Sequence, residues 1–121
     1  MKFREFKTSS EKLVLAGKSA ENNEDLVGQV EKNEDVFHTA KPGSPFVNIK
    51  AARTNAKDRK EAAIFCALKS QDWRDNKSDV LIHWFKGKDV YKKKGMKTGC
   101  FGVKKHKDVL IKKMQIENAS S

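Results

Sequence analysis

Alternating apolar and polar positions predict two hairpins in the first half of the chain. Apolar residues within 3–7 and 13–16 flank a polar connection, as in a short hairpin. The run DVFHTAKPGSPFVNIK, at 35–50, reads as strand, turn and strand, because Pro42 fixes φ and Gly43 tolerates the positive φ of a tight turn. We therefore expect a stiff turn in this second hairpin.

Helical spacing predicts two helices. Ser19 is suited to cap a helix over 19–30. Asp58 and Glu61 fit a capping box at the start of a second helix, over 59–71. Small residues form a stripe on one face of the second helix, which favours close packing on a sheet: Ala63, Cys66, Ala67 and Ser70.

The second half of the chain reads as strands joined by polar segments. Residues 71–77 should form a polar connection, and the apolar run at 79–85 predicts a central strand. Within that strand we expect His83 to be a hydrogen-bonded, mostly buried imidazole. Short apolar groups between 90 and 111, separated by lysine-rich turns, predict two or three further strands.

These elements predict an α+β fold with a largely antiparallel sheet of short strands and two packed helices. A chain of 121 residues suits one domain, which we place at 1–117, with a flexible tail at 118–121. No apolar run approaches the roughly 20 residues of a membrane span, so we expect no membrane partner. Two cysteines and no signal-like start favour a reducing, cytoplasmic location. The oligomeric state is left open.

Charge is the strongest compositional feature, and it is unevenly placed. The net charge is +10, and residues 86–113 alone carry eleven lysines against two aspartates, a net +9. Residues 19–36 carry a net −5. The molecule should therefore be polarised, with one end that attracts polyanions.

The sequence contains no recognised catalytic or metal-binding motif. The cysteines and histidines are scattered without CxxC or HxxxH spacing, so we expect no metal or other cofactor. Asp35, His38 and Ser44 lie close enough in sequence for a nucleophilic triad, but polar groups beside tight turns usually hydrogen-bond the backbone. We therefore favour a structural role for these residues and expect no enzyme.

The hairpin sequence, with EAAIFCALKS about ten residues later, resembles the NFACT RNA-binding domain. Val36 stands where many members carry Trp, and Pro45 where many carry His, which resembles small stand-alone members of archaeal type. The resemblance implies binding to structured RNA, ribosomal RNA or tRNA, in translation or ribosome-associated quality control. The large ribosomal subunit is one implied partner, and the tail-synthesis domains of full-length members are not expected here.

Lysine-rich turns beside short strands suit phosphate contacts, since ammonium groups attract the backbone without reading bases. We expect a polar turn formed by His38, Lys41 and Ser44 to lie beside these contacts. The expected phosphate contacts are Lys92, Lys93, Lys94, Lys97, Lys104, Lys105 and Lys107. A protein-interaction module for an acidic partner, using the same lysines, is the alternative. A hydrolase centred on His38 and Ser44 is a weaker one.

Overall fold

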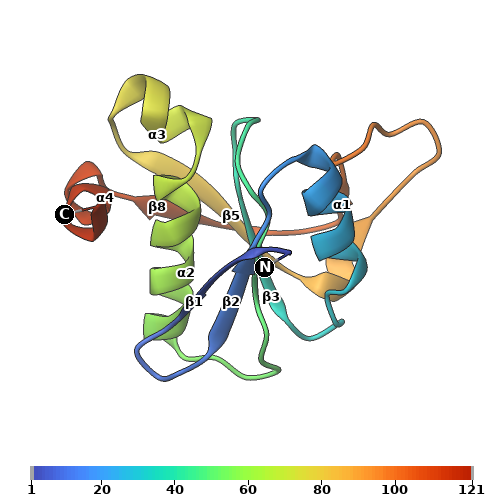
Figure 1. The fold of residues 1–121 in the computed structure, drawn as a ribbon, viewed down its shortest axis with the longest axis horizontal. Coiled ribbons are helices and arrows are strands. Elements are labelled where there is room, and N and C mark those ends of the chain that lie inside the picture. The colour runs from blue at the N-terminus through green and yellow to red at the C-terminus, as the bar shows by residue number, and fades with distance from the viewer. Residues whose placement is uncertain (1, 121) are drawn as a thin grey trace.

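The molecule is built on an antiparallel sheet of six strands (Figure 1). The computed structural model describes residues 2–120. Along the sheet, the order is β1-β2-β4-β3-β5-β8. The strands are β1 (Arg4–Lys7), β2 (Leu13–Ala16), β3 (Asp35–Thr39), β4 (Val47–Ile49), β5 (Val80–Lys86) and β8 (Lys107–Ile111). A separate two-stranded ribbon is formed by β6 (Val90–Tyr91) and β7 (Gly102–Val103). The predicted α+β class and antiparallel sheet are confirmed.

Four α-helices accompany the sheet, where the sequence predicted two. They are α1 (Ala20–Gly28), α2 (Ala56–Leu68), α3 (Gln71–Asn76) and α4 (Lys113–Ser120), with a 3₁₀ turn at Gly87–Asp89. The predicted polar connection at 71–77 is therefore wrong, because Ser70 caps α3 by accepting from the Trp73 amide and Trp73 is buried. Residues 118–120, expected in a flexible tail, continue α4, and Ser121 lies outside the described residues.

The start of α2 differs from the predicted capping box. Asn55 caps the helix, and its side chain and that of Asp58 bond reciprocally to each other's backbone N–H. Glu61 instead accepts a hydrogen bond from the Ser9 amide at 2.8 Å, which ties α2 to the first hairpin. The sequence contains two overlapping capping-box patterns, one starting at Asn55 and one at Asp58. The first one forms, because Glu61 of the second binds the β1–β2 connection instead.

The hairpin at 35–50 forms as predicted. Strands β3 and β4 pair antiparallel, with Phe37 opposite Val47. Gly43 adopts a φ of +90°, and a Cβ atom there would lie 2.5 Å from the Gln71 side chain. The backbone N–H of Gln71 donates to the Gly43 carbonyl at 2.8 Å. The turn is therefore held against the start of α3 and requires glycine at this position.

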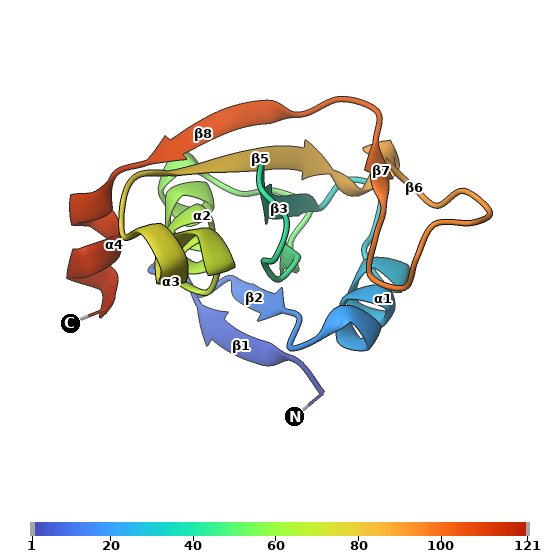
Figure 2. The same ribbon diagram turned by 90° about the horizontal axis from the view of Figure 1, so that it is seen from above.

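Side chains alternate across the sheet and form two separate apolar clusters. On one face, Phe37 and Ile82 pack with α2 and α4 in the larger cluster. On the other face, Val36 and Phe85 pack with Leu26 of α1 in the smaller cluster. Seen from above, α1 lies beyond one end of the sheet and α2 lies under β5 (Figure 2). The surface of β3, β5 and β8 that faces away from α2 is therefore left partly open.

The two cysteines differ sharply in environment. Cys66 is fully buried against the hairpin, and burial raises the pKa of its thiol to about 12, whereas Cys100 is exposed. A three-unit rise lowers the thiolate fraction at neutral pH by a factor of about a thousand. We expect a thiol reagent to modify Cys100 in the native protein and Cys66 only after denaturation, measured by mass spectrometry. Equal labelling of both thiols under native conditions would contradict this packing.

None of the described helices is long and apolar enough to cross a bilayer.

Candidate nucleic-acid interface

A groove of about 850 Å³ opens on the sheet face that α2 leaves uncovered. Its floor comes from the sheet, through His38 on β3 and His83 on β5. Its walls come from four segments that are distant in sequence: the start of α1, the Pro-Gly turn, the α2–α3 corner and residues 98–106. The hairpin with its stiff turn therefore forms one side of a concave surface.

The groove is lined by cationic and neutral residues. Five basic side chains contribute to the lining: Arg4, Lys18, Lys41, Lys69 and Arg74. Three histidines add to them: His38, His83 and His106. Among the described residues, no aspartate or glutamate lines the groove. A concave surface with one sign of charge concentrates the field and attracts polyanions.

Aromatic rings form the apolar part of the groove. The His38 ring lies 4.4 Å from the Phe46 ring, and Phe46 meets Phe101 edge-on at 5.5 Å. Phe46 is buried, whereas His38 and Phe101 are half-buried. Rings that remain partly open beside cationic groups are suited to contact unpaired bases.

His38 is held in one orientation, and its burial favours the neutral imidazole. Its Nδ1 lies 2.8 Å from the Thr39 carbonyl, which accepts only, so Nδ1 carries the proton. Burial lowers the pKa of His38, an effect opposed in part by the bond to Thr39. Its Nε2 is therefore left as an acceptor.

The Pro-Gly turn is braced by its own polar groups. Ser44 Oγ accepts from the Thr39 amide at 3.1 Å and donates to the Pro45 carbonyl at 3.2 Å. Lys41 forms an ion pair with Asp72 at 3.6 Å, in which the Asp72 side chain is almost fully buried. Of the turn residues predicted to bind, all three line the groove: His38, Lys41 and Ser44.

The proposed triad does not assemble. Asp35 lies three residues before His38, so it points to the opposite face of β3. There its carboxylate accepts hydrogen bonds from Trp84 Nε1 and Lys86 Nζ, both at 2.8 Å. Ser44 directs its hydroxyl to the backbone of its own turn. Asp35 also accepts from the Thr54 hydroxyl, so each of the three side chains bonds to groups other than the remaining two, in line with the favoured structural interpretation.

The predicted lysine cluster is divided by the fold. Lys92 reaches across to α1, where its ammonium lies 2.6 Å from Glu24 and also donates to the carbonyls of Lys97 and Cys100. This hydrogen bond lowers the pKa of Glu24, which also accepts from the Gly99 amide. Lys92 therefore braces the β6–β7 loop against α1.

Lys107 lies on the other face of the sheet. Its ammonium is 5.4 Å from the centre of the Trp84 ring, which Arg59 of α2 also approaches at 4.9 Å. Trp84 and Lys107 thus lie away from the groove, whose floor on β5 is His83. Neither residue is placed beside the other predicted contacts.

The remaining predicted lysines do not line the groove. Lys93 and Lys94 are exposed in the β6–β7 loop, which projects from the body in both views (Figures 1 and 2). Lys97 precedes the lining residue Thr98, and Lys104 and Lys105 lie between the lining residues Val103 and His106. These three lysines are exposed and adjacent in sequence to groove-lining residues, and we call them the rim lysines.

His83 is not the mostly buried residue that was predicted. Its side chain is 30% exposed and stacks on His106 with ring centres 3.8 Å apart. The register of β5 and β8 places Asp108 directly opposite His83. The cysteines and histidines are thus not all scattered as the sequence spacing indicated, because strand pairing unites two histidines with a carboxylate.

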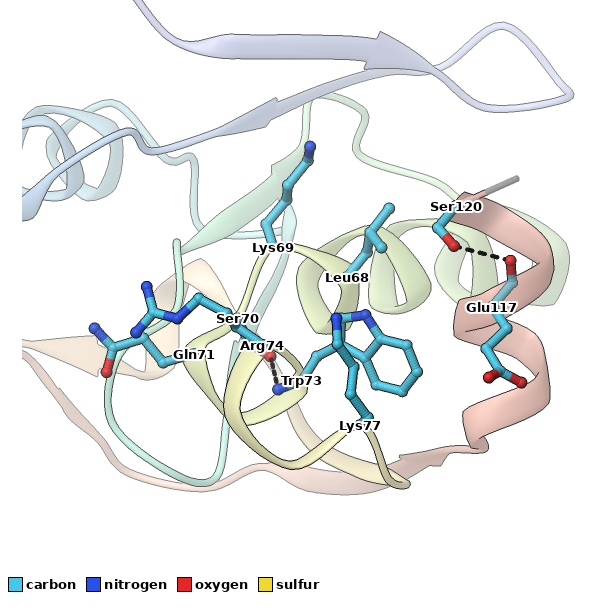
Figure 3. A pocket seen from close by; sticks show the side chains of 9 residues that line it. All are labelled: Leu68, Lys69, Ser70, Gln71, Trp73, Arg74, Lys77, Glu117 and Ser120. Atoms are coloured by element: carbon cyan, nitrogen blue, oxygen red, sulfur yellow. Dashed lines mark hydrogen bonds between the residues drawn. The ribbon is translucent and has the colours of Figure 1, made fainter.

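A second hollow, of about 560 Å³, lies between α2, α3 and α4 (Figure 3). It contains Glu117, and its central ring, Trp73, is 6% exposed and covered by the Lys77 ammonium at 4.9 Å. Lys69 and Arg74 line both hollows, so the α2–α3 corner separates them. Because its ring is already covered and it includes a carboxylate, this hollow is the weaker anion site.

Four of the groove's basic residues were not predicted: Arg4, Lys18, Lys69 and Arg74. Successive members of this set lie 14, 51 and 5 residues apart in the sequence. Only the assembly of the sheet and its helices brings them together. No local signal in the sequence marks them.

Comparison with known proteins gives a family and a fold. The model of the NFACT protein RNA binding domain matches residues 2–105. Among solved structures, the C-terminal part of the fibronectin/fibrinogen-binding protein from Streptococcus suis has a TM-score of 0.82 at 22% identity. The match covers 98% of this chain and 49% of that one, so this chain spans about half of that structure. None of the curated proteins matches the sequence significantly.

Proposed function

Because this chain belongs to the NFACT RNA-binding domain family, we propose that it binds structured RNA, namely ribosomal RNA or tRNA, in the cytoplasm. The setting we propose is ribosome-associated translation or quality control, with the large ribosomal subunit as a partner. RNA binding follows from the family. The kind of RNA and the ribosomal setting are our proposal, which the experiments below test.

One observation supports this proposal above the others: a groove lined by five basic side chains and by no carboxylate of the described residues. RNA phosphates are neutralised by such groups, with release of counterions. The half-buried rings of His38 and Phe101 lie within the same groove, where unpaired bases can stack. The basic side chains suit RNA phosphates, and the rings suit unpaired RNA bases.

The exposed lysines at the rim extend this surface. Among the described residues, Lys97, Lys104 and Lys105 have no carboxylate partner. Their ammonium groups are thus available to phosphates on either side of the groove. Lysine suits contact with the backbone rather than bidentate reading of base edges, so we propose recognition of shape more than sequence.

Filter binding over a salt series tests the proposal. The ligands are tRNA, ribosomal RNA and an acidic protein of similar charge, each measured from low to moderate salt. We expect both RNAs to bind more tightly than the acidic protein, with log affinity falling linearly with log salt. Equal binding of the acidic protein would favour the protein-interaction alternative. Sedimentation with separated ribosomal subunits then tests the ribosomal partner, which requires co-sedimentation with the large subunit.

A further inference from the structure

Three metal-ligating side chains meet at the edge of the open sheet face. His83 lies on β5, Asp108 is its direct partner on β8, and His106 immediately precedes β8. The ligand atoms of the three lie within 4.8 Å of one another. Asp108 Oδ1 is 3.2 Å from His106 Nε2 and 3.7 Å from His83 Nε2. Two imidazole nitrogens therefore converge on a single carboxylate oxygen.

These separations are near those of a metal site. In a tetrahedral zinc site with bonds of about 2.0–2.2 Å, neighbouring ligand atoms lie about 3.3 Å apart. The distance from Asp108 to His106 lies close to that value, and that to His83 lies somewhat above it. Because all three ligand atoms lie within 4.8 Å of one another, side-chain rotations can bring them around an ion. The His106 and Asp108 side chains are 37% and 61% exposed, which leaves an ion free to enter.

The donor chemistry of the cluster also suits a cation. Neutral imidazole and ionised carboxylate are the forms in which these side chains ligate metals. A carboxylate and two imidazoles that share one small space bring several lone pairs together, and a cation relieves that repulsion.

We propose that His83, His106 and Asp108 bind a divalent first-row metal ion of the Zn²⁺ type at the mouth of the groove. Two histidines and one carboxylate are a donor set that such ions favour, and three protein ligands leave at least one coordination position open. Because both histidines line the groove, the open position faces the surface proposed for RNA. The site stands on the geometry of the three side chains and does not rest on the proposed RNA-binding function.

Metal titration of the tag-free, chelator-treated protein tests this site. We expect one equivalent of Zn²⁺ to bind by isothermal titration calorimetry, and one equivalent of Co²⁺ to give visible absorption of a low-coordinate complex. His106→Ala and Asp108→Asn should each weaken binding at least about tenfold, since loss of even an outer-shell group costs about 10–100-fold. Circular dichroism checks that each variant is folded.

Two control variants separate this site from other exposed ligands. His38→Gln removes a histidine that lines the same groove but lies outside the cluster, and Cys100→Ser removes the exposed thiol. Both should retain wild-type affinity for the metal. Absence of Zn²⁺ and Co²⁺ binding in the wild-type protein, or binding that survives His106→Ala, would overturn the proposal. RNA binding measured with chelator present reports on the RNA proposal alone, so the two fail independently.

Discussion

Changing Lys97, Lys104 and Lys105 together to glutamate should lower affinity for RNA by about two orders of magnitude at 0.1 M salt. Each phosphate contact contributes about 0.7–0.9 to the slope of log affinity against log salt, and three contacts are removed. We therefore expect the slope to fall by about 2 to 3 across unrelated RNA sequences. Filter binding over a salt series measures both quantities.

A matched variant tests whether position or net charge causes the effect. Lys57, Lys60 and Lys113 are exposed on α2 and α4, which pack against the opposite face of the sheet. Their replacement by glutamate changes the net charge by the same amount. We expect this variant to bind RNA within about threefold of the wild type, because the sheet separates its changes from the groove and salt screens exposed charges over about 10 Å. Equal losses in both variants would remove the rim lysines from the interface.

Replacing Asp35 with alanine should destabilise the protein by about 1–3 kcal/mol, the cost of leaving a buried hydrogen-bond donor without its acceptor. The Lys86 side chain is 38% exposed, so water can still solvate its ammonium. The Asp35 side chain is 1% exposed and accepts from Lys86 and Trp84, both at 2.8 Å. Its removal leaves the Trp84 N–H and the Thr54 hydroxyl without this acceptor, whereas the Lys86 ammonium keeps the Asn33 carbonyl at 3.4 Å. Urea unfolding measures the change, and Asp35→Asn should fall between the wild type and Asp35→Ala because its oxygen still accepts.

The control for Asp35 is an exposed ion pair. Asp25 lies 3.5 Å from Lys2, and its side chain is 54% exposed, so Asp25→Ala should cost less than about 1 kcal/mol. Under conditions where Asp35→Ala remains folded, we expect it to bind RNA normally, because Asp35 points away from the groove. A stable Asp35→Ala protein that fails to bind RNA would show that Asp35 acts in binding and not in stability.

Local chemistry was sufficient to predict the central hairpin. Pro42 and Gly43 restrict the backbone to a turn, and the apolar residues on either side have the alternation of paired strands. The small-residue stripe of α2 was likewise predictable, since Ala63 and Cys66 are fully buried against the sheet. The turn and the stripe each depend on residues that are close in sequence, so they can be recognised without knowing the fold.

The missed helices are short and depend on tertiary contacts. Helix α3 has six residues, too few to show a periodic apolar face, and is anchored by one buried ring, Trp73. Helix α4 is mainly polar and is held in place by Ile116, which packs into the larger apolar cluster beside α2. Isolated helices of this length are unstable in water, so packing decides their existence.

The candidate site was predicted only where it coincides with the hairpin. His38, Lys41 and Ser44 line the groove as one turn, but the lysine-rich region was treated as a single surface. Sequence proximity does not fix the direction of a long side chain: Lys92 is engaged by Glu24, and Lys107 lies over the opposite face. The pairing of His83 with Asp108 depends on strand register, which cannot be read from the sequence across the 24 residues between them.

Alternation along β3, β5 and β8 gives the sheet two independent sets of positions. Phe37 and Ile82 secure the core under α2, while their sequence neighbours His38 and His83 face the open side. A combinatorial library restricted to His38, His83, His106 and Asp108 would therefore leave both apolar clusters intact. Directed evolution on this scaffold should yield new ligand specificities while the melting temperature stays nearly constant.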